Sequence, residues 1–250
     1  VGGILVIDLG GVHPAAEAEV RMDDWSHLSV GNTYWLDMFH AERQPFDSTF
    51  EVKSNLRVQV CPPPSAPPEP SPPPPSPPPS PPPKPPPCAE MVDPFVIIDV
   101  IYRDFNENHP DFFRNVYSMS VTTGMVASQL VDGKPFCVNR TGTCGAYCPT
   151  LPNTGAGMLD DCSTMNAEWF TDVPGVNSKV EQTLVLDYDP ETFVSTFSSN
   201  AYFPLDGRGF NEMRSYYGSG THNFFFTSEI NLTFAYRGGE VFSFQGDDDV

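Results

Sequence analysis

A proline-rich segment between Cys61 and Cys88 constrains this chain more than any other feature. It reads CPPPSAPPEPSPPPPSPPPSPPPKPPPC, and most of its residues are prolines. Proline fixes the backbone φ angle and lacks a backbone N–H, so such a run enters neither a helix nor a sheet. We therefore predict a polyproline II linker over residues 61–88. At about 3.1 Å per residue, the extended linker would span on the order of 80 Å.

The linker divides the chain into two unequal pieces, residues 1–60 and 89–250, and both read as strands. Period-two alternation and runs of β-branched or aromatic residues predict strands. They occur at VGGILVIDL, NTYWLDMFHAE, STFEVKSNLRVQV, PFVIIDVIYRDF, SKVEQTLVLDYD, THNFFFTSEINLTFAYR and EVFSFQGDDDV. Only MNAEWF and residues 110–116 favour short helices. The fold class is therefore mainly β, and the three strands expected in residues 1–60 need a partner surface.

Charge and cysteine content indicate an extracellular protein. The chain has 32 acidic residues against 13 Lys plus Arg, and this net charge of −19 argues against binding to nucleic acid or to an anionic membrane. Six cysteines and two Asn-x-Thr sequons, at Asn139 and Asn231, fit an oxidising compartment. No apolar run is long enough to span a bilayer, and no signal peptide begins at Val1, so we expect both ends to be cut from a longer precursor.

Four cysteines lie close together in an insertion rich in Gly, Thr, Pro and Asn. They are Cys137, Cys144, Cys148 and Cys162. We expect irregular backbone held by two local disulfides. Zinc is the alternative, but a zinc site would favour closely spaced pairs such as Cys-x-x-Cys, which are absent.

The linker resembles the Ser-Pro repeats of extensin-type hydroxyproline-rich glycoproteins, because Ser71, Ser76 and Ser80 each precede three or four prolines. The resemblance implies a secreted wall, coat or fibre protein with hydroxylated and O-glycosylated prolines. The candidates are Pro72, Pro73, Pro74, Pro77, Pro78, Pro81 and Pro82. An inert linker and a ligand for an aromatic groove are the alternatives, and the second would need an intracellular setting.

Many motifs outside the linker occur in a recognisable order. After the linker they are RDFNENHPDF, GMVASQLVDGKPF, WFTDVPGVN, YFPLDGRGF, HNFFFTSEI and FSFQGDDDV; before it they are DLGGVH and FHAER. Together they resemble the fibro-slime domain of surface and adhesive proteins. The resemblance implies a β-sandwich of the protective-antigen type, with residues 1–60 as its C-terminal part and residues 89–250 as its N-terminal part.

The order of the two parts is reversed relative to that family. There the Gly-Asp-Asp-Asp-Val segment runs on into Asp-Leu-Gly-Gly-Val-His, whereas here the first closes the chain and the second opens it. Either the two pieces close on each other as a permuted domain, or each completes a neighbouring unit. We favour head-to-tail completion, which builds a fibre and satisfies exposed strand edges. In the completed domain we expect Cys61 and Cys88 to pair, closing the domain or linking neighbours.

One acidic cluster is a candidate calcium site. In a hairpin with Gly2 and Gly3 in its turn, Val250 would lie roughly opposite Asp8. Carboxylate oxygens would then converge as Ca²⁺ requires. In yeast adhesins of the protective-antigen type, paired aspartates hold a calcium that contacts sugars. The expected ligands are Asp8, Asp247, Asp248 and Asp249. The alternative is a solvated acidic strand end.

No catalytic motif is present in the sequence, and we do not expect an enzyme. His13, His40 and His222 lie within the motifs, and packing in a sandwich is the commoner role for such histidines. The sequence therefore predicts an extracellular structural glycoprotein, the repeat unit of a filament, wall or coat. Its partners would be copies of itself and covalent glycans. The alternative is a calcium-dependent carbohydrate-binding adhesin.

Overall fold

The computed structural model describes residues 1–11, 13–43, 48–60, 89–90, 95–112, 121–139, 143–144, 162–210, 214–215 and 221–247. The protein is mainly β. Its strands are β1 (Ala16–Arg21), β2 (Thr33–Glu42), β3 (Phe50–Ser54), β4 (Arg57–Val60), β5 (Ala89–Glu90), β6 (Phe95–Phe105), β7 (Thr122–Thr123), β8 (Thr143–Cys144), β9 (Asn177–Asp189), β10 (Val194–Ser199), β11 (Arg214–Ser215), β12 (Thr221–His222), β13 (Phe226–Ala235) and β14 (Val241–Gly246). The described helices are short: η1 (Met22–Asp24), α1 (Cys162–Thr164) and the π-helical η2 (Met165–Trp169).

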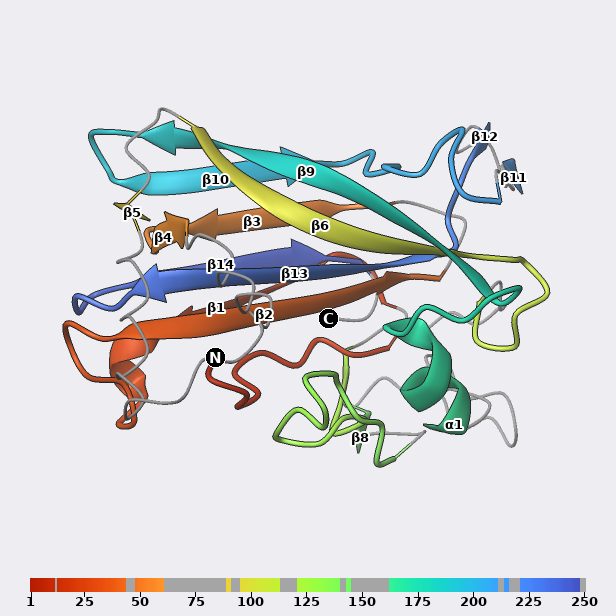
Figure 1. Cartoon of the computed structure of the whole chain (residues 1–250), viewed down its shortest axis with the longest axis horizontal. Helices are drawn as coiled ribbons and strands as arrows, with labels where there is room; N and C mark the ends of the chain where they lie inside the picture. Colours follow the sequence, from red (N-terminus) through yellow and green to blue (C-terminus); the bar gives the residue numbers. More distant parts are fainter. Residues whose placement is uncertain are drawn as a thin grey trace, which may run out of the picture.

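Ten of these strands form one antiparallel sheet in the order β1-β14-β3-β10-β9-β6-β13-β4-β5, with β2 also paired to β13. Strand β2 covers the full length of β13 on one side, so β6 and β4 share the other side. Strands β13 and β14 are consecutive in the chain but are separated in the sheet by β3, β10, β9 and β6. Because Phe234 of β13 and Phe244 of β14 are nevertheless buried in one cluster, the sheet curls around a single large core (Figure 1).

Alternation explains why the long strands form as they do. In β6 the side chains of Val96, Ile98 and Val100 are buried, whereas Phe95 and Ile97 are exposed on the opposite face. Successive side chains of a strand point to opposite faces, so this pattern buries one face in the core. The strand predictions for β2, β6, β9, β13 and β14 are confirmed.

Residues 1–60 differ from their prediction in three places. The stretch VGGILVIDL is not a strand, because Gly2 and Gly3 form a turn with positive φ and only Ile4 makes an isolated bridge. Strand β1 was not predicted, since its sequence AEAEVR is short and rich in charge. The run STFEVKSNLRVQV divides into β3 and β4. This piece therefore supplies four strands to the large sheet.

A second, smaller core lies beside the sheet. Helix η2 buries Met165 and Trp169 there against Phe105, Phe112 and other aromatic side chains. The predicted helix in MNAEWF is thus confirmed. In Figure 1 this region lies at one end of the sheet, below the strands.

The residues that flank the linker are neighbours in the sheet. Strands β4 and β5 are antiparallel partners, with Val60 opposite Ala89. Residues 61–88 lie outside the described residues, and so do the proline candidates. The described ends show that, within one chain, the two pieces meet at the linker's two ends and are not held apart by its length.

Candidate functional site at the seam between the two pieces

Residues 1–60 and residues 89–247 meet along a seam that runs through the large sheet. Strand β14 has β1 on one side and β3 on the other, and both neighbours come from residues 1–60. Strand β3 in turn lies between β14 and β10. Figure 1 shows β3, in orange, among strands of the later part of the chain. Neither piece could complete this sheet by itself.

An aromatic cluster fills the core at the seam. Phe50 of β3 stacks on Tyr202 with ring centroids 4.3 Å apart and packs edge-on against Phe244 at 5.2 Å. His40 of β2 lies edge-on to Phe50 at 5.3 Å and 6.2 Å from the ring of Phe226. Two of these five side chains come from the first piece, so the core itself is shared across the seam.

His40 is held neutral in this cluster. Its Nδ1 lies 3.1 Å from the Ser228 hydroxyl, and its Nε2 is buried. Burial, with a smaller contribution from the charge of His13, lowers the pKa of His40 to about 3. An uncharged imidazole surrounded by rings fits the packing role predicted for the histidines and offers no base to a substrate from solvent.

The first ten residues form an arm that docks on the loop 122–130 of the second piece. The Leu5 N–H donates to the Ser128 carbonyl at 2.9 Å, and the Leu130 N–H donates to Gly3 at 3.0 Å. Gly11, with φ of 88°, follows the arm; a Cβ atom there would lie 2.8 Å from the Thr122 hydroxyl. The Gly-Gly pair of the DLGGVH motif thus permits close backbone approach.

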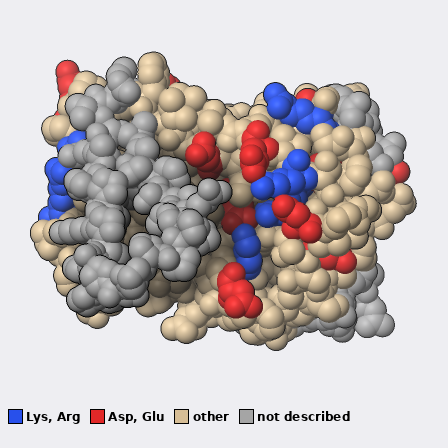
Figure 2. Space-filling view, in the orientation of Figure 1, with Lys and Arg blue, Asp and Glu red and all other residues tan. Residues whose placement is uncertain are grey.

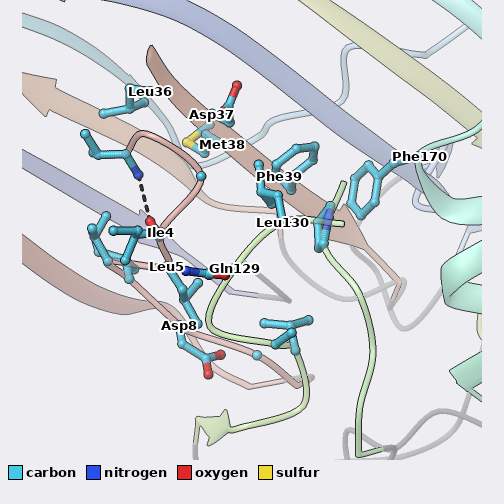
Figure 3. A pocket seen from close by; sticks show the side chains of 18 of the residues that line it. Ile4, Leu5, Asp8, Leu36, Asp37, Met38, Phe39, Gln129, Leu130 and Phe170 are labelled. Carbon is cyan, nitrogen blue, oxygen red and sulfur yellow. Dashed lines mark hydrogen bonds between the residues drawn. The ribbon is translucent and has the colours of Figure 1, made fainter. Parts of the chain in front are cut away.

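A small apolar pocket of about 120 Å³ lies under this arm. Ile4, Leu5 and Met38 line it from the first piece, and Leu130 and Phe170 line it from the second (Figure 3). Its volume is below the about 300 Å³ of binding pockets for drug-sized molecules, and Asp8, Asp37 and Gln129 add polar groups to its lining. Because both pieces line it, the pocket is part of the packing of the seam.

Asp8 and Asp247 each accept a backbone hydrogen bond across the seam. The Asp8 carboxylate accepts the Gly124 N–H at 2.8 Å. The Asp247 carboxylate accepts the Thr49 N–H at 2.8 Å, and its main-chain carbonyl accepts the His13 N–H at 3.1 Å. Asp248 and Asp249 lie outside the described residues. The calcium set stays a prediction, and two of its members have a structural role in the seam.

Ion pairs cover part of the sheet's outer face. Arg103 donates to Asp172 and to Glu229, each at 2.9 Å, and Glu229 also pairs with Lys134. Arg103 and Glu229 are buried, so this pair is shielded from solvent. Figure 2 shows basic and acidic side chains side by side near the middle of the face in view. Arg103 and Lys134, two of the few cations of this acidic chain, thus neutralise the buried Glu229 carboxylate.

The remaining predicted residues are the cysteines and the two sequon asparagines, and of these Asn231 lies opposite Asp37 of the first piece. Cys137 and Cys162 form a disulfide that ties the insertion to α1. The backbone of Cys144 is in β8; Cys61, Cys88 and Cys148 lie outside the described residues. Asn139 and Asn231 are both exposed.

Sequence reasoning missed the residues that join the arm to the second piece. The contacts of Ser128 and Leu130 are made through backbone groups, so no side-chain pattern signals them. Among the described residues, no group of three or more His, Cys, Asp or Glu could hold a metal ion. Within the same ranges, no helix has the length and apolar character needed to cross a membrane.

The fold and the seam define a mainly β protein whose antiparallel sheet is built from two pieces of sequence that flank a proline-rich linker. The chain is similar to proteins of Dictyostelium discoideum, of which three illustrate the match. It is 36% identical to protein psiD over 163 residues, which cover 63% of this chain and 30% of psiD. It is 30% identical to psiR over 173 residues, 65% of this chain and 16% of psiR. It is 33% identical to psiC over 156 residues, 60% of this chain and 28% of psiC.

The chain therefore spans less than a third of each of these relatives. No protein-family model matches the chain, and no solved structure matches it.

Proposed function

We propose that this chain is a unit of an extracellular structural glycoprotein, and that residues 1–60 of one unit complete the sheet of the next. The observation that carries the proposal is the position of β14, whose two neighbours both come from residues 1–60. We further propose that the curled sheet is a β-sandwich of the fibro-slime type and that the linker is an O-glycosylated polyproline II spacer. No reaction is proposed.

In the described chain, residues 1–60 pair with residues of the same chain. Exchange between chains would keep every strand pair and change only which chain supplies the first piece. An extended linker on the order of 80 Å is long enough to reach a neighbouring unit. Such an exchange is heterologous and open, so it extends into a filament.

A cross-strand cysteine pair tests the exchange. Lys53 of β3 is opposite Thr196 of β10, and we propose the double variant Lys53→Cys/Thr196→Cys in the full chain. In native assemblies, oxidation is expected to give a ladder of covalent oligomers on a non-reducing gel. The double variant and both single-variant controls also carry Cys61→Ser and Cys88→Ser, because a Cys61–Cys88 link between exchanged chains would itself give a ladder. In that background each single variant should give no ladder.

Co-assembly of the two single variants is a second test of exchange between chains. A Lys53→Cys chain and a Thr196→Cys chain with different tags should become cross-linked only when one chain's β3 lies in the other chain's sheet. If the double variant is quantitatively cross-linked within monomers in material that forms filaments, the exchange is wrong and closure within each chain is correct.

Calcium-dependent sugar binding remains the alternative function. A lectin would lose sugar binding when Asp247 and Asp248 are both changed to Asn, whereas a structural unit would still assemble. Comparing glycan binding and filament formation in this one variant separates the two functions.

A further inference from the structure

Four side chains lie together on the outer face of β2 and β13. Asn231 is opposite Asp37, and Thr233 is opposite Trp35. Cross-strand partners share a face of the sheet. Trp35 is therefore the diagonal neighbour of Asn231, while the intervening Leu232 is buried in the core on the other face.

Trp35 is unusual among the tryptophans of this chain. Its side chain is 60% exposed, whereas Trp169 is 1% exposed and Trp25 packs edge-on against His27 at 5.9 Å. Among the described residues, no aromatic ring or cation packs on the Trp35 indole. A single exposed apolar side chain is normal on a protein surface, but the Trp35 ring lies beside an asparagine of a glycosylation sequon, and a sugar attached there could pack on its face.

Asn231 is placed to present such a group. It is exposed and belongs to the sequon Asn231-Leu232-Thr233. Its Nδ2 donates to the Asp37 carboxylate at 2.9 Å. A glycosylated asparagine keeps one N–H, so this hydrogen bond can persist and fix the direction in which the sugar leaves the strand.

We propose that Asn231 carries an N-linked glycan and that its first N-acetylglucosamine packs on the indole of Trp35. Diagonal neighbours in a sheet are about 7–8 Å apart, a gap that the asparagine side chain and one pyranose ring bridge. The apolar C–H face of the sugar then covers the indole. The inference rests on the extracellular, glycosylated part of the proposed function, but not on exchange between units.

The modification is a group transfer in the secretory compartment. The Asn231 amide nitrogen forms a bond to C1 of the sugar and loses one proton, and the C1–oxygen bond to a lipid-linked diphosphate breaks. The donor is thus a lipid diphosphate oligosaccharide. Trp35 takes no part in that step. Its indole contacts the sugar only in the folded protein.

The test uses the full chain secreted from eukaryotic cells. Glycopeptide mass spectrometry is expected to show Asn231 occupied. Denaturant unfolding is then measured for the wild type, Trp35→Ala, Asn231→Gln and the double variant. We expect each single change to raise the unfolding equilibrium constant about two- to tenfold, the range for ring packing, and the double change to add little further. Asn139→Gln, which removes the loop sequon, should give no such coupling with Trp35→Ala.

Enzymatic trimming of the glycan tests the proposed packing on Trp35 without any substitution. An endoglycosidase that leaves one N-acetylglucosamine should preserve the stability and the tryptophan emission of the native glycoprotein, whereas complete removal should red-shift the emission. An unoccupied Asn231, or additive effects of the two substitutions, would overturn the proposal. Either result could occur with filament assembly intact, so failure of this inference is distinguishable from failure of the exchange.

Discussion

At the residue scale, His40 makes stability depend on pH. The folded protein holds the His40 pKa at about 3, below the ordinary value of 6.5. Below pH 6.5 the unfolded chain therefore binds a proton at His40 more readily than the folded protein does. The contribution of the neutral His40 to the free energy of unfolding is complete above pH 6.5 and is lost as the pH falls from there towards 3. By pH 5 the loss would be about 2 kcal/mol.

The measurement is urea unfolding at pH 7 and pH 5. The His40→Phe variant places another ring in the aromatic cluster. It should reduce the difference in unfolding free energy between pH 7 and pH 5 by about 2 kcal/mol. His27→Gln changes an exposed histidine and should leave the difference as in the wild type. An unchanged pH dependence in His40→Phe would contradict the assignment.

Two glycines in the YFPLDGRGF motif should respond very differently to the same substitution. Gly209 has φ of 61°, and a Cβ atom there would lie 2.2 Å from the carboxylate of Asp104, which is buried. Gly207 has φ of 71° but nothing within 4 Å. We expect Gly207→Ala to cost about 1 kcal/mol for the left-handed backbone alone. Gly209→Ala should cost at least about 2 kcal/mol more, because Asp104 must move from its hydrogen bonds.

Thermal unfolding of the two variants checks this comparison. Equal losses in Tm would show that Asp104 can shift without penalty. The Asp104 carboxylate accepts from the Asn223 amide at 2.7 Å and also from the Phe210 N–H, which is why we expect the cost to be large.

At the element scale, the register of β4 and β5 sharpens the prediction for Cys61 and Cys88. Val60 is opposite Ala89, and a ladder continued by one step would place residues 61 and 88 opposite each other. Antiparallel partners lie about 4.5–5.5 Å apart, within the range that a disulfide spans. Non-reducing peptide mapping is expected to recover a Cys61–Cys88 peptide pair.

The matched control for that mapping is the Cys137–Cys162 pair, which the structure contains. Recovery of Cys137–Cys162 without Cys61–Cys88 would show that the ladder ends at residues 60 and 89. Mixed isotopic labelling of two batches would also tell whether the Cys61–Cys88 link joins one chain or two.

The elements with strong alternation could be predicted from the sequence, but their partners could not. Strand β9 was evident from its period-two pattern, and so was β6. Nothing local shows that β3 inserts between β14 and β10, because pairing across nearly 200 residues leaves no trace in either strand. The strand predicted over residues 1–9 is wrong, because the apolar residues of this stretch line a pocket and do not pair in the sheet. The arm's partners are backbone groups, which explains why that part of the site was also missed.

At the scale of the whole molecule, the net charge of −19 should oppose both folding and association. We expect NaCl to raise the Tm and to speed assembly, measured by calorimetry and by light scattering, because salt screens the repulsion. CaCl₂ at matched ionic strength should raise the Tm further if Asp247 and its neighbours bind calcium, and Asp248→Asn should remove that excess. Identical shifts with the two salts would contradict the calcium prediction.

The position of β14 also has a consequence for how the protein is made. Glu17 pairs with Gln245, so β1 is synthesised long before β14, the partner strand that it needs. Long-range pairing of this kind slows folding and leaves β1 and β3 without this neighbour until β14 has been made. Chaperone dependence during synthesis, and sensitivity to any delay in making β14, would follow from the same arrangement that closes the sheet.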